Sequence, residues 1–264
     1  MRTEREIVLK ISGENLEITN SGLSDADEDF LAHIQNHSVE NYRRYVAHLL
    51  HTESVELAMA KAIGCQSMDE WIGTGNGQVA VLRHHGLQDG MSIYDLGCGS
   101  GRTASALLRA DWKGHYRGHD IVEELVDYLR NSCPGYEAAV NRNLTLLAES
   151  DSLDMVFHWS VFTHLFIEEC YLYLEDIYRG LKPGGKLVFS FLELENSQHL
   201  DIVFADRVEY FRDRRSLGHL DTFLHRSQIR LMAERIGFDD IAFTDGADGT
   251  QHPPFWQSLV SMRK

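Results

Sequence analysis

The sequence lacks the features that would indicate a secreted or membrane-spanning protein. Its four cysteines are widely spaced and form no Cys-x-x-Cys pair, which argues against a disulfide framework and predicts reduced thiols. No apolar run approaches the roughly 18–20 residues of a membrane span. The first residues, Met-Arg-Thr-Glu-Arg-Glu, hold no apolar signal-peptide core. We therefore expect a cytoplasmic protein with no membrane partner.

Positive charge and metal-ligand motifs are also scarce. The formal net charge is −15, which argues against a nucleic-acid partner because such binding depends on Lys and Arg contacts to phosphate. The 14 histidines form no His-Glu-x-x-His motif and no quartet with cysteines. We therefore expect no metal site.

The first 88 residues differ from the remainder in their expected organisation. Apolar and polar residues alternate over 5–19, which predicts a small hairpin. Helical patterns follow at about 24–37, 39–51 and 53–63, and glycines then punctuate the chain before a helix at about 78–85. We expect residues 1–88 to form a hairpin and helical extension that covers the functional site.

From residue 89 to 264 strands and helices alternate, which predicts an α/β fold with a doubly wound, mostly parallel seven-stranded sheet and helices on both faces. The segment at about 194–225 is irregular and is expected to be an inserted cap. The expected strands are 92–96, 115–120, 136–140, 154–159, 185–192, 239–244 and 256–262. The expected helices are 102–110, 122–132, 166–180 and 226–236.

The most informative segment is 92–102, Ser-Ile-Tyr-Asp-Leu-Gly-Cys-Gly-Ser-Gly-Arg. A short apolar strand ends at an acid, three glycines alternate, and a helix begins. Glycines let a ligand approach the backbone closely, and the free N–H groups of a helix start favour a polar or anionic ligand. The segment therefore predicts a site for a nucleoside-like ligand.

Two kinds of nucleoside cofactor fit such a turn. Dinucleotide-binding turns have the pattern Gly-x-Gly-x-x-Gly, in which the third glycine lets the helix pack on the strand. Here the pattern is Gly-x-Gly-x-Gly, and Arg102 holds the position of that third glycine. Asp120, at the end of the next strand, can hold both ribose hydroxyls of either cofactor, so it does not discriminate.

Motifs further along the chain do discriminate. Leu181-Lys182-Pro183-Gly184-Gly185-Lys186 ends a helix and starts a strand. Together with the glycine turn and the Asp154-Met155-Val156 strand, it resembles the class I S-adenosylmethionine-dependent methyltransferases over about residues 90–264. The segments 160–165, 171–174 and 190–193 are similar to a bacterial small-molecule subgroup of uncertain substrate. The resemblance implies S-adenosylmethionine as cofactor and S-adenosylhomocysteine as product.

The resemblance also implies roles for single residues. The turn residues would line the methionine and ribose, Asp95 would orient the turn or meet the amino group, and Asp120 would accept both ribose hydroxyls. Ile121 would pack against adenine, unless it is a core residue, and Asn143 would meet the adenine amino group. The expected cofactor-binding residues are Asp95, Gly97, Cys98, Gly99, Gly101, Asp120, Ile121, Asn143 and Trp159.

Catalysis depends on the acceptor atom, because an oxygen nucleophile must lose a proton and a general base adds about 10²–10⁴-fold to the rate. Ligands of a parallel sheet lie at the carboxyl ends of its strands. The candidates there are His164 as base, Glu193 to orient a hydroxyl or bind an amine, and His158. His164 could instead bond a loop carbonyl, and His158 could simply pack. His199 and His219 in the cap are reserves.

The leading hypothesis is a methyltransferase that acts on an oxygen of a small-molecule acceptor, such as a glycan or secondary metabolite. Methylation of a nitrogen, of a peptide or of a protein is the first alternative. A cofactor-binding subunit without chemistry of its own is the second. A nicotinamide oxidoreductase is disfavoured by the glycine spacing and by the Lys-Pro-Gly-Gly turn.

Overall fold

The computed structural model describes residues 9–12, 15–18, 25–213, 220–250 and 255–264. The chain divides into two compact units, residues 1–40 and 41–264. In the first unit, β1 (Leu9–Ser12) and β2 (Asn15–Ile18) form an antiparallel pair, as the predicted hairpin requires. No described helix combines the length and the apolar character that a membrane span needs.

The helices that precede the sheet differ from the expected ones. α1 (Asp25–Thr52) is one continuous helix where two were predicted, because no glycine or proline interrupts this stretch. It is followed by α2 (Val55–Ala62) and α3 (Met68–His84). α3 begins ten residues earlier than predicted and contains three glycines. A Cβ at Gly75 would lie 2.8 Å from the carbonyl oxygen of Arg102, so this glycine allows α3 to pack closely on the next helix.

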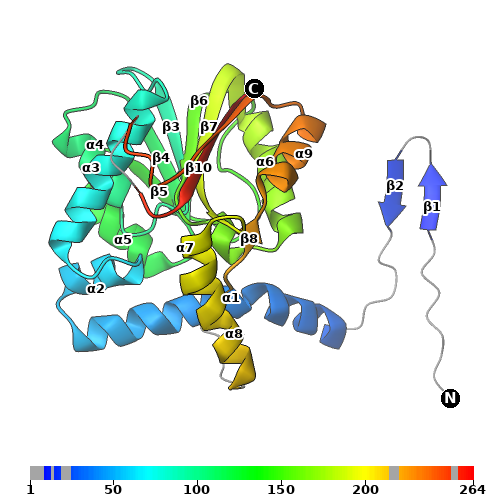
Figure 1. Cartoon of the computed structure of the whole chain (residues 1–264), viewed down its shortest axis with the longest axis horizontal. Coiled ribbons are helices and arrows are strands. Elements are labelled where there is room, and N and C mark those ends of the chain that lie inside the picture. Colours follow the sequence, from blue (N-terminus) through cyan, green and yellow to red (C-terminus); the bar gives the residue numbers. More distant parts are fainter. Residues whose placement is uncertain (1–8, 13–14, 19–24, 214–219, 251–254) are drawn as a thin grey trace. The chain divides into compact units, whose positions relative to one another are not determined.

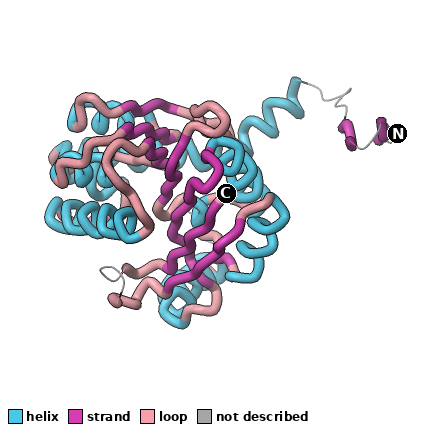
Figure 2. The backbone as a smooth tube through the Cα atoms, turned by 90° about the horizontal axis from the view of Figure 1, so that it is seen from above, coloured by secondary structure: helices cyan, strands magenta, loops and turns pink. Residues whose placement is uncertain are grey.

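The second unit is built on one twisted sheet (Figures 1 and 2). The strand order is β5-β4-β3-β6-β7-β10-β9, and β8 pairs with β7. β3 to β7 are parallel, whereas β10 runs antiparallel to both of its neighbours. The strands are β3 (Ser92–Leu96), β4 (His115–Asp120), β5 (Glu137–Val140), β6 (Leu153–His158), β7 (Leu181–Glu193), β8 (Phe223–Leu224), β9 (Asp239–Thr244) and β10 (Ser258–Arg263).

The predicted doubly wound sheet is confirmed. β7 alone begins clearly earlier than expected, because Leu181 already pairs with Leu153 before the Lys-Pro-Gly-Gly turn. The remaining elements are α4 (Arg102–Arg109), α5 (Glu123–Ser132), the 3-10 turn η1 (Phe162–His164), α6 (Ile167–Gly180), α7 (Ser197–His199), the π-helical η2 (Leu200–Phe204), α8 (Ala205–Arg212) and α9 (Arg226–Ile236).

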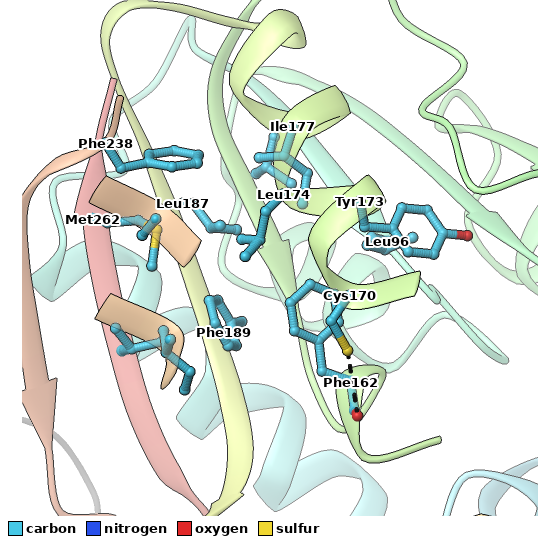
Figure 3. Packing of buried hydrophobic residues seen from close by; sticks show 14 of the residues in the cluster. Leu96, Phe162, Cys170, Tyr173, Leu174, Ile177, Leu187, Phe189, Phe238 and Met262 are labelled. Carbon is cyan, nitrogen blue, oxygen red and sulfur yellow. Dashed lines mark hydrogen bonds between the residues drawn. The ribbon is translucent and has the colours of Figure 1, made fainter. Parts of the chain in front are cut away.

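Alternate residues of the strands face two hydrophobic cores. Ile93 and Met155 pack with α3, α4 and α5, whereas Tyr94 and Val156 pack with α6 and α9, because successive side chains of a strand point to opposite faces. Figure 3 shows the second core, where Leu174 of α6 lies against β7.

The chain order places the site. β3 has β4 on one side and β6 on the other, and ligands of open α/β sheets bind outside the carboxyl ends of the strands at such a switch point. The turn after β3 therefore occupies the expected position for a ligand. In the predicted cap, α7, η2 and α8 follow one another without a break (Figure 1). His219 lies outside the described residues.

Candidate functional site

The turn between β3 and α4 has a shape that only glycine tolerates. Gly97 has φ +70°, and a Cβ there would lie 2.4 Å from Cγ2 of Val161. Gly99 has φ +52°, and its Cβ would lie 2.8 Å from Cγ2 of Ile63. Both positions combine a left-handed backbone with close neighbours. Val161 and Ile63 therefore pack directly on the backbone of this glycine turn, which we call the cradle.

Bonds to the end of β4 hold the turn in place. The amides of Gly97 and Cys98 both donate to the carbonyl oxygen of His119, at 2.9 Å. The amide of Gly99 donates to Oδ2 of Asp120, also at 2.9 Å. The side chain of Cys98 is buried. These bonds fix the distance between the turn and Asp120.

Asp120 ends β4 with its carboxylate beside the turn. Its Oδ1 accepts from the amide of Val122 at 3.1 Å, so each oxygen has one backbone donor. Burial raises the pKa of Asp120, while the bonds from Val122 and Gly99 act in the opposite direction. A carboxylate oxygen has more than one acceptor position. Asp120 therefore retains the capacity to accept from ligand hydroxyls.

Asp95 is the second buried acid at the turn. It is 3% exposed, and Oδ2 accepts from the hydroxyl of Tyr116 at 2.8 Å. Burial raises the pKa of Asp95 to about 7, against the lowering effects of Tyr116, Arg102 and Thr103. Asp95 thus titrates near neutral pH.

Ile121 follows Asp120 and packs in a hydrophobic cluster with Tyr42 and Ile63. Tyr42, on α1, is a residue that the sequence analysis missed. Burial, followed by the charges of Asp120 and Asp221, raises its pKa. The ring of Tyr42 lies 5.6 Å from that of His164, edge to face. The helical pattern predicted over about 39–51 gave no signal that connected Tyr42 with Asp120 or His164.

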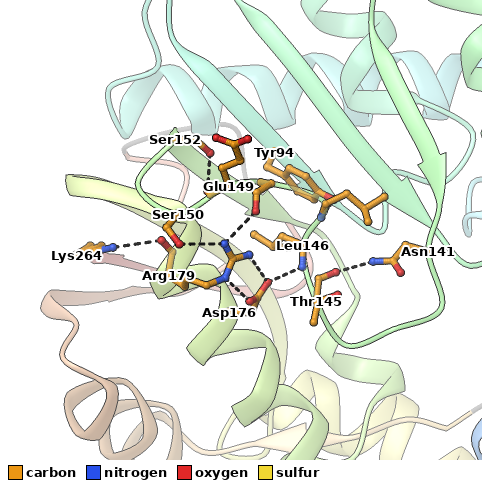
Figure 4. A network of polar contacts seen from close by, with 12 residues as sticks. Tyr94, Asn141, Thr145, Leu146, Glu149, Ser150, Ser152, Asp176, Arg179 and Lys264 are labelled. Carbon is orange, nitrogen blue, oxygen red and sulfur yellow. Dashed lines mark hydrogen bonds and ion pairs between the residues drawn. The ribbon is translucent and has the colours of Figure 1, made fainter.

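The loop after β5 is held by polar contacts from α6 (Figure 4). Asp176 accepts from the amide of Leu146 at 2.6 Å, and Arg179 donates to the carbonyl of Ala148 at 3.0 Å. Asn141 accepts from the amide of Asn143 at 3.1 Å. Asn141 is therefore used within the loop, whereas Asn143 is exposed.

Trp159 lies just beyond β6 and is partly buried. Its ring lies 4.4 Å from that of Phe255 and 6.3 Å from that of Phe157. These contacts account for its packing, and its contact with a cofactor stays a prediction.

His164 is partly buried at the end of η1, after β6. Its Nδ1 lies 2.8 Å from the carbonyl oxygen of Leu220, at the end of the cap. The bond to a loop carbonyl, expected as the alternative to a catalytic role, is therefore present. This bond fixes the orientation of the ring, and a catalytic role for His164 stays a prediction.

The carboxylate of Glu193 is bound by other side chains of the protein. It is 4% exposed, and its carboxylate accepts from Nη2 of Arg226 at 2.9 Å and from the hydroxyl of Ser258 at 2.6 Å. Burial would raise the pKa of Glu193, but these bonds hold it below its usual value. We therefore interpret Glu193 as one half of an internal ion pair, in place of a group that meets the acceptor.

The side chains of His158 and His199 are also buried and contact only other parts of the protein in the described residues. His158 is fully buried, with its ring 4.6 Å from that of Phe189 and 4.2 Å from that of Phe162. Burial lowers the pKa of His158 to about 3. His199 accepts from the amide of Glu193 at 2.9 Å and donates to the carbonyl of Trp256 at 2.8 Å. Packing explains His158, and hydrogen bonding explains His199.

A largely buried ion pair joins α8 to the segment that precedes β8. Arg207 of α8 contacts Asp221, and their side chains are 17% and 7% exposed. Both charges act on the hydroxyl of Tyr42. Sequence reasoning missed this pair because charged residues in an irregular segment carry no signal of their partner. Within the described residues, no three His, Cys, Asp or Glu side chains gather as a metal site requires.

Two cavities lie away from the glycine turn. One, of about 410 Å³, is lined by residues of β4, α5 and β5, including Arg117 and Arg130. The other, of about 400 Å³, lies over α6 and α9 and is lined by Tyr171 and Leu172, among others. Neither cavity is lined by a residue of the turn, so neither is assigned to the candidate site.

Comparisons with known proteins agree with this geometry. A family model described as a methyltransferase domain matches residues 93–185. The chain is 32% identical over 111 residues to an uncharacterized methyltransferase of Schizosaccharomyces pombe, which covers 40% of this chain and 41% of that protein. The chain thus spans about two fifths of that relative's length.

Two further comparisons cover more of the chain. It is 25% identical over 195 residues to a carboxy-S-adenosyl-L-methionine synthase of Enterobacter sp., which covers 67% of this chain and 75% of that protein. A solved structure from Thermotoga maritima, described as a possible histamine N-methyltransferase, has a TM-score of 0.56 at 14% identity and covers 86% of this chain and 100% of that one. Residues 93–185 thus form a methyltransferase domain, and the strand order and glycine turn around it resemble those of the class I S-adenosylmethionine-dependent methyltransferases.

Proposed function

We propose that the chain transfers a methyl group from S-adenosylmethionine to an oxygen of a small-molecule acceptor, such as a glycan or secondary metabolite, with His164 as the base. The observation that carries this proposal is the 2.8 Å bond between His164 Nδ1 and the carbonyl oxygen of Leu220. A carbonyl only accepts, so Nδ1 carries the proton and Nε2 is the basic nitrogen of the neutral ring. Nε2 of His164 would then take the proton of an acceptor hydroxyl.

The residues of the turn fit the cofactor. The left-handed backbone at Gly97 and Gly99, held by bonds to the end of β4, suits a ligand that lies against the turn. Asp120 would accept from the ribose hydroxyls, Ile121 would pack against adenine, and Asn143 would meet the adenine amino group. When bound, S-adenosylmethionine supplies a methyl group on a positively charged sulfur.

The remaining cofactor contacts would come from both sides of the turn. Asp95 would meet the methionine ammonium, while Cys98 and Gly101 would complete the cradle. Trp159 would line the site from the loop after β6. Tyr42 would contact the acceptor, since its ring lies 5.6 Å from that of His164 and its hydroxyl lies within the field of Asp120.

Segments outside the alternating strands and helices would close the site. Of the predicted extension over residues 1–88, α2 reaches the turn, where the hydroxyl of Ser100 donates to the carbonyl of Met59 at 3.0 Å. From the cap, the amide of Thr222 donates to the carbonyl of Thr163 at 2.6 Å. Closure on both sides supports orientation of the acceptor and exclusion of water.

We also propose a cytoplasmic location and no nucleic-acid partner. All four cysteines are buried and free, which suits a reducing compartment. The net charge of −15 opposes binding to a phosphate backbone.

Calorimetry with the full chain tests the cofactor. We expect S-adenosylhomocysteine to bind with micromolar or better affinity and NAD not to bind. Binding of NAD alone would reject the proposal and favour an oxidoreductase.

Transfer of a labelled methyl group tests the chemistry. S-Adenosylmethionine labelled in its methyl group is offered with panels of phenols, sugars, amines and peptides. We expect label in hydroxyl compounds, and we expect His164→Ala to lower the rate by about 10²–10⁴-fold without changing the affinity for S-adenosylhomocysteine. His115→Ala, at the exposed start of β4, is the matched control.

Each contrary outcome has a defined meaning. Label in amines only, with His164→Ala as active as the wild type, would reject the oxygen acceptor, because a neutral amine needs no base. Label in peptides only would reject the small-molecule acceptor. Tight cofactor binding without transfer to any panel would favour a binding subunit.

A further inference from the structure

Gln257, directly before β10, connects the ends of two parallel strands. Its Oε1 accepts from the hydroxyl of Ser160, just beyond β6, at 3.0 Å and from the hydroxyl of Ser190, in β7, at 2.6 Å. β10 runs antiparallel to β7, and Ser258 pairs with Phe191 near the end of β7. Gln257 therefore lies at the carboxyl edge of the sheet, where ligands of such sheets bind.

The hydrogen bonds of Ser190 determine which way the amide of Gln257 points. The side chain of Ser190 is fully buried, and its oxygen already accepts from the amide of Ser160 at 2.8 Å. The proton of Ser190 needs an acceptor of its own, because a buried donor left unpaired costs free energy. Oε1 of Gln257 is that acceptor, so the amide nitrogen of Gln257 is turned away from both hydroxyls.

The amide nitrogen of Gln257 has two protons to donate. Across the residues that the structure describes, this nitrogen forms no hydrogen bond. It is also not one of the buried polar atoms that lack a partner, so it is open to solvent. Because an amide nitrogen donates and does not accept, its partner in a ligand would be an acceptor such as an oxygen.

The backbone next to Gln257 is held in an unfavourable conformation. Ser160 has φ +60°, in the left-handed region that a side chain disfavours. Its bonds to Ser190 and Gln257 hold it there, and the hydroxyl of Thr163 adds a bond to its carbonyl at 2.6 Å. Strained residues that persist under such bonding are common at functional sites. The same loop carries His164, four residues further on.

The position of Gln257 in the sheet separates it from the cofactor turn. The turn follows β3, whereas Gln257 bonds to residues at the ends of β6 and β7, on the other side of the sheet order. The neighbouring Trp256 contacts the start of the cap, where its carbonyl accepts from His199 at 2.8 Å. Gln257 is thus associated with the loop of the proposed base and with the cap.

We propose that the amide nitrogen of Gln257 donates to an oxygen of the acceptor other than the hydroxyl that is methylated. This inference rests on the proposed function and narrows its substrate class to hydroxyl compounds that carry a second, hydrogen-bond-accepting oxygen. One contact at His164 and another at Gln257 fix the orientation of an acceptor, which a single contact does not. Gln257 is then a specificity residue of the acceptor site.

Pairs of acceptors that differ by one oxygen test this assignment in the labelled-methyl assay with the full-length protein. Methoxyphenols are compared with the ethylphenols of the same substitution pattern, and methoxycyclohexanols with ethylcyclohexanols. Each pair exchanges an ether oxygen, which can only accept, for a methylene group. We expect the kcat/KM of the wild type to be about 5–50-fold higher for the preferred methoxy compound than for its ethyl partner.

Gln257→Glu separates the donor from the hydrogen bonds that hold the loop. One carboxylate oxygen still accepts from the hydroxyls of Ser160 and Ser190, while the other replaces the donating nitrogen. We expect the methoxy-to-ethyl ratio of kcat/KM to fall to about 1, mainly through a higher KM for the methoxy compound. The affinity for S-adenosylhomocysteine and the midpoint of unfolding in urea should stay at their wild-type values.

A matched control is the same exchange on α9. The side-chain oxygen of Gln228 accepts from the amide of His225 at 3.1 Å, so Gln228→Glu also keeps its accepting oxygen and should retain the wild-type ratio. Should Gln257→Glu fail to fold fully, Gln257→Met gives the same comparison, because the ratio of two acceptors does not depend on how much of a variant is folded.

The proposal is overturned if the wild type uses both members of every pair equally. It is also overturned if Gln257→Glu slows both members by the same factor, because Gln257 would then only hold Ser160 in place. Transfer to none of the hydroxyl compounds, with S-adenosylhomocysteine still bound, would reject the proposed oxygen acceptor and this inference with it. That result is distinct from the loss of a preference between two compounds that are both methylated.

Discussion

The turn after β3 and the end of β7 both lie at the carboxyl edge of the sheet, yet internal hydrogen bonds have opposite consequences there. At the turn, bonds from Gly97 and Gly99 to the end of β4 fix a shape and leave the carboxylate of Asp120 able to accept more. At β7, the bonds from Arg226 and Ser258 use the carboxylate of Glu193 itself. Internal bonding shapes the backbone in the first region and occupies the candidate carboxylate in the second.

The difference follows from which atoms are bonded. A backbone amide that bonds internally still defines the surface that a ligand meets. A buried carboxylate that neutralises an arginine cannot leave that partner without a large penalty, because the arginine would remain uncompensated. Burial of charge at a strand end is therefore poor evidence for catalysis when the partner is internal.

The largest effect is expected at the cradle. Gly97→Ala adds a Cβ 2.4 Å from Val161 at φ +70°, so we expect a loss of about 2–5 kcal/mol in the free energy of unfolding and no measurable binding of S-adenosylhomocysteine. Gly135→Ala is the control, because Gly135 also has a positive φ of +95° but a Cβ there would meet no atom within 4 Å. This variant should have a strained backbone and still bind S-adenosylhomocysteine. Equal binding by both variants would contradict a shape-specific cradle.

Glu193 tests the other side of the comparison. Glu193→Ala leaves Arg226 without its partner, and we expect the free energy of unfolding in urea to fall by about 2–3 kcal/mol, while the folded protein binds S-adenosylhomocysteine normally. Because the folded-state pKa of Glu193 is lowered, its stabilisation is present at neutral pH and disappears as the pH falls below the ordinary glutamate pKa of 4.5. The variant should lose less stability than the wild type over that range.

A contrary result for Glu193 is easily recognised. If Glu193→Gln unfolds like the wild type and yet transfers methyl groups far more slowly, the carboxylate acts on the acceptor and the structural interpretation is wrong.

Asp95 gives the cofactor side a pH dependence. Its pKa of about 7 means that the carboxylate becomes neutral on acidification and loses its attraction for the ligand's ammonium. We expect the affinity for S-adenosylhomocysteine to fall by up to about tenfold per pH unit below pH 7, measured by calorimetry between pH 5 and 8. Asp95→Asn should give a flat profile; a flat wild-type profile would show that the ammonium is bound elsewhere.

The sequence predicted the backbone of the glycine turn better than the surroundings of the catalytic candidates. Glycine spacing and the strands that precede Asp95 and Asp120 are local features, and local features determine the backbone of the turn. The roles of Glu193 and His199 depend on Arg226, Ser258 and Trp256, which are distant in the sequence. Their partnership appears only when the sheet and α9 are assembled.

The same limit applies to the helices. The glycines of residues 73–77 predict no helix, but close packing of α3 on α4 requires a small residue at Gly75 and overrides the low helix propensity of glycine. Tyr42 lies far from His164 along the chain, so only the folded unit brings the two rings to 5.6 Å.

The smallest effect is expected at His158, which separates packing from catalysis. Neither ring nitrogen of His158 has a hydrogen-bond partner among the described residues, and its ring stacks on Phe189. His158→Phe retains the aromatic contacts and removes two unsatisfied polar atoms, so we expect a change within about 1.5 kcal/mol at pH 7 and unchanged methyl transfer. Because its pKa falls from 6.5 to about 3 on folding, the unfolded chain takes up a proton first, and the wild type loses stability as the pH falls below 6.5. In urea titrations, the free energy of unfolding of His158→Phe should fall less on acidification than that of the wild type. Slower methyl transfer by a stable His158→Phe protein would restore His158 as a catalytic candidate.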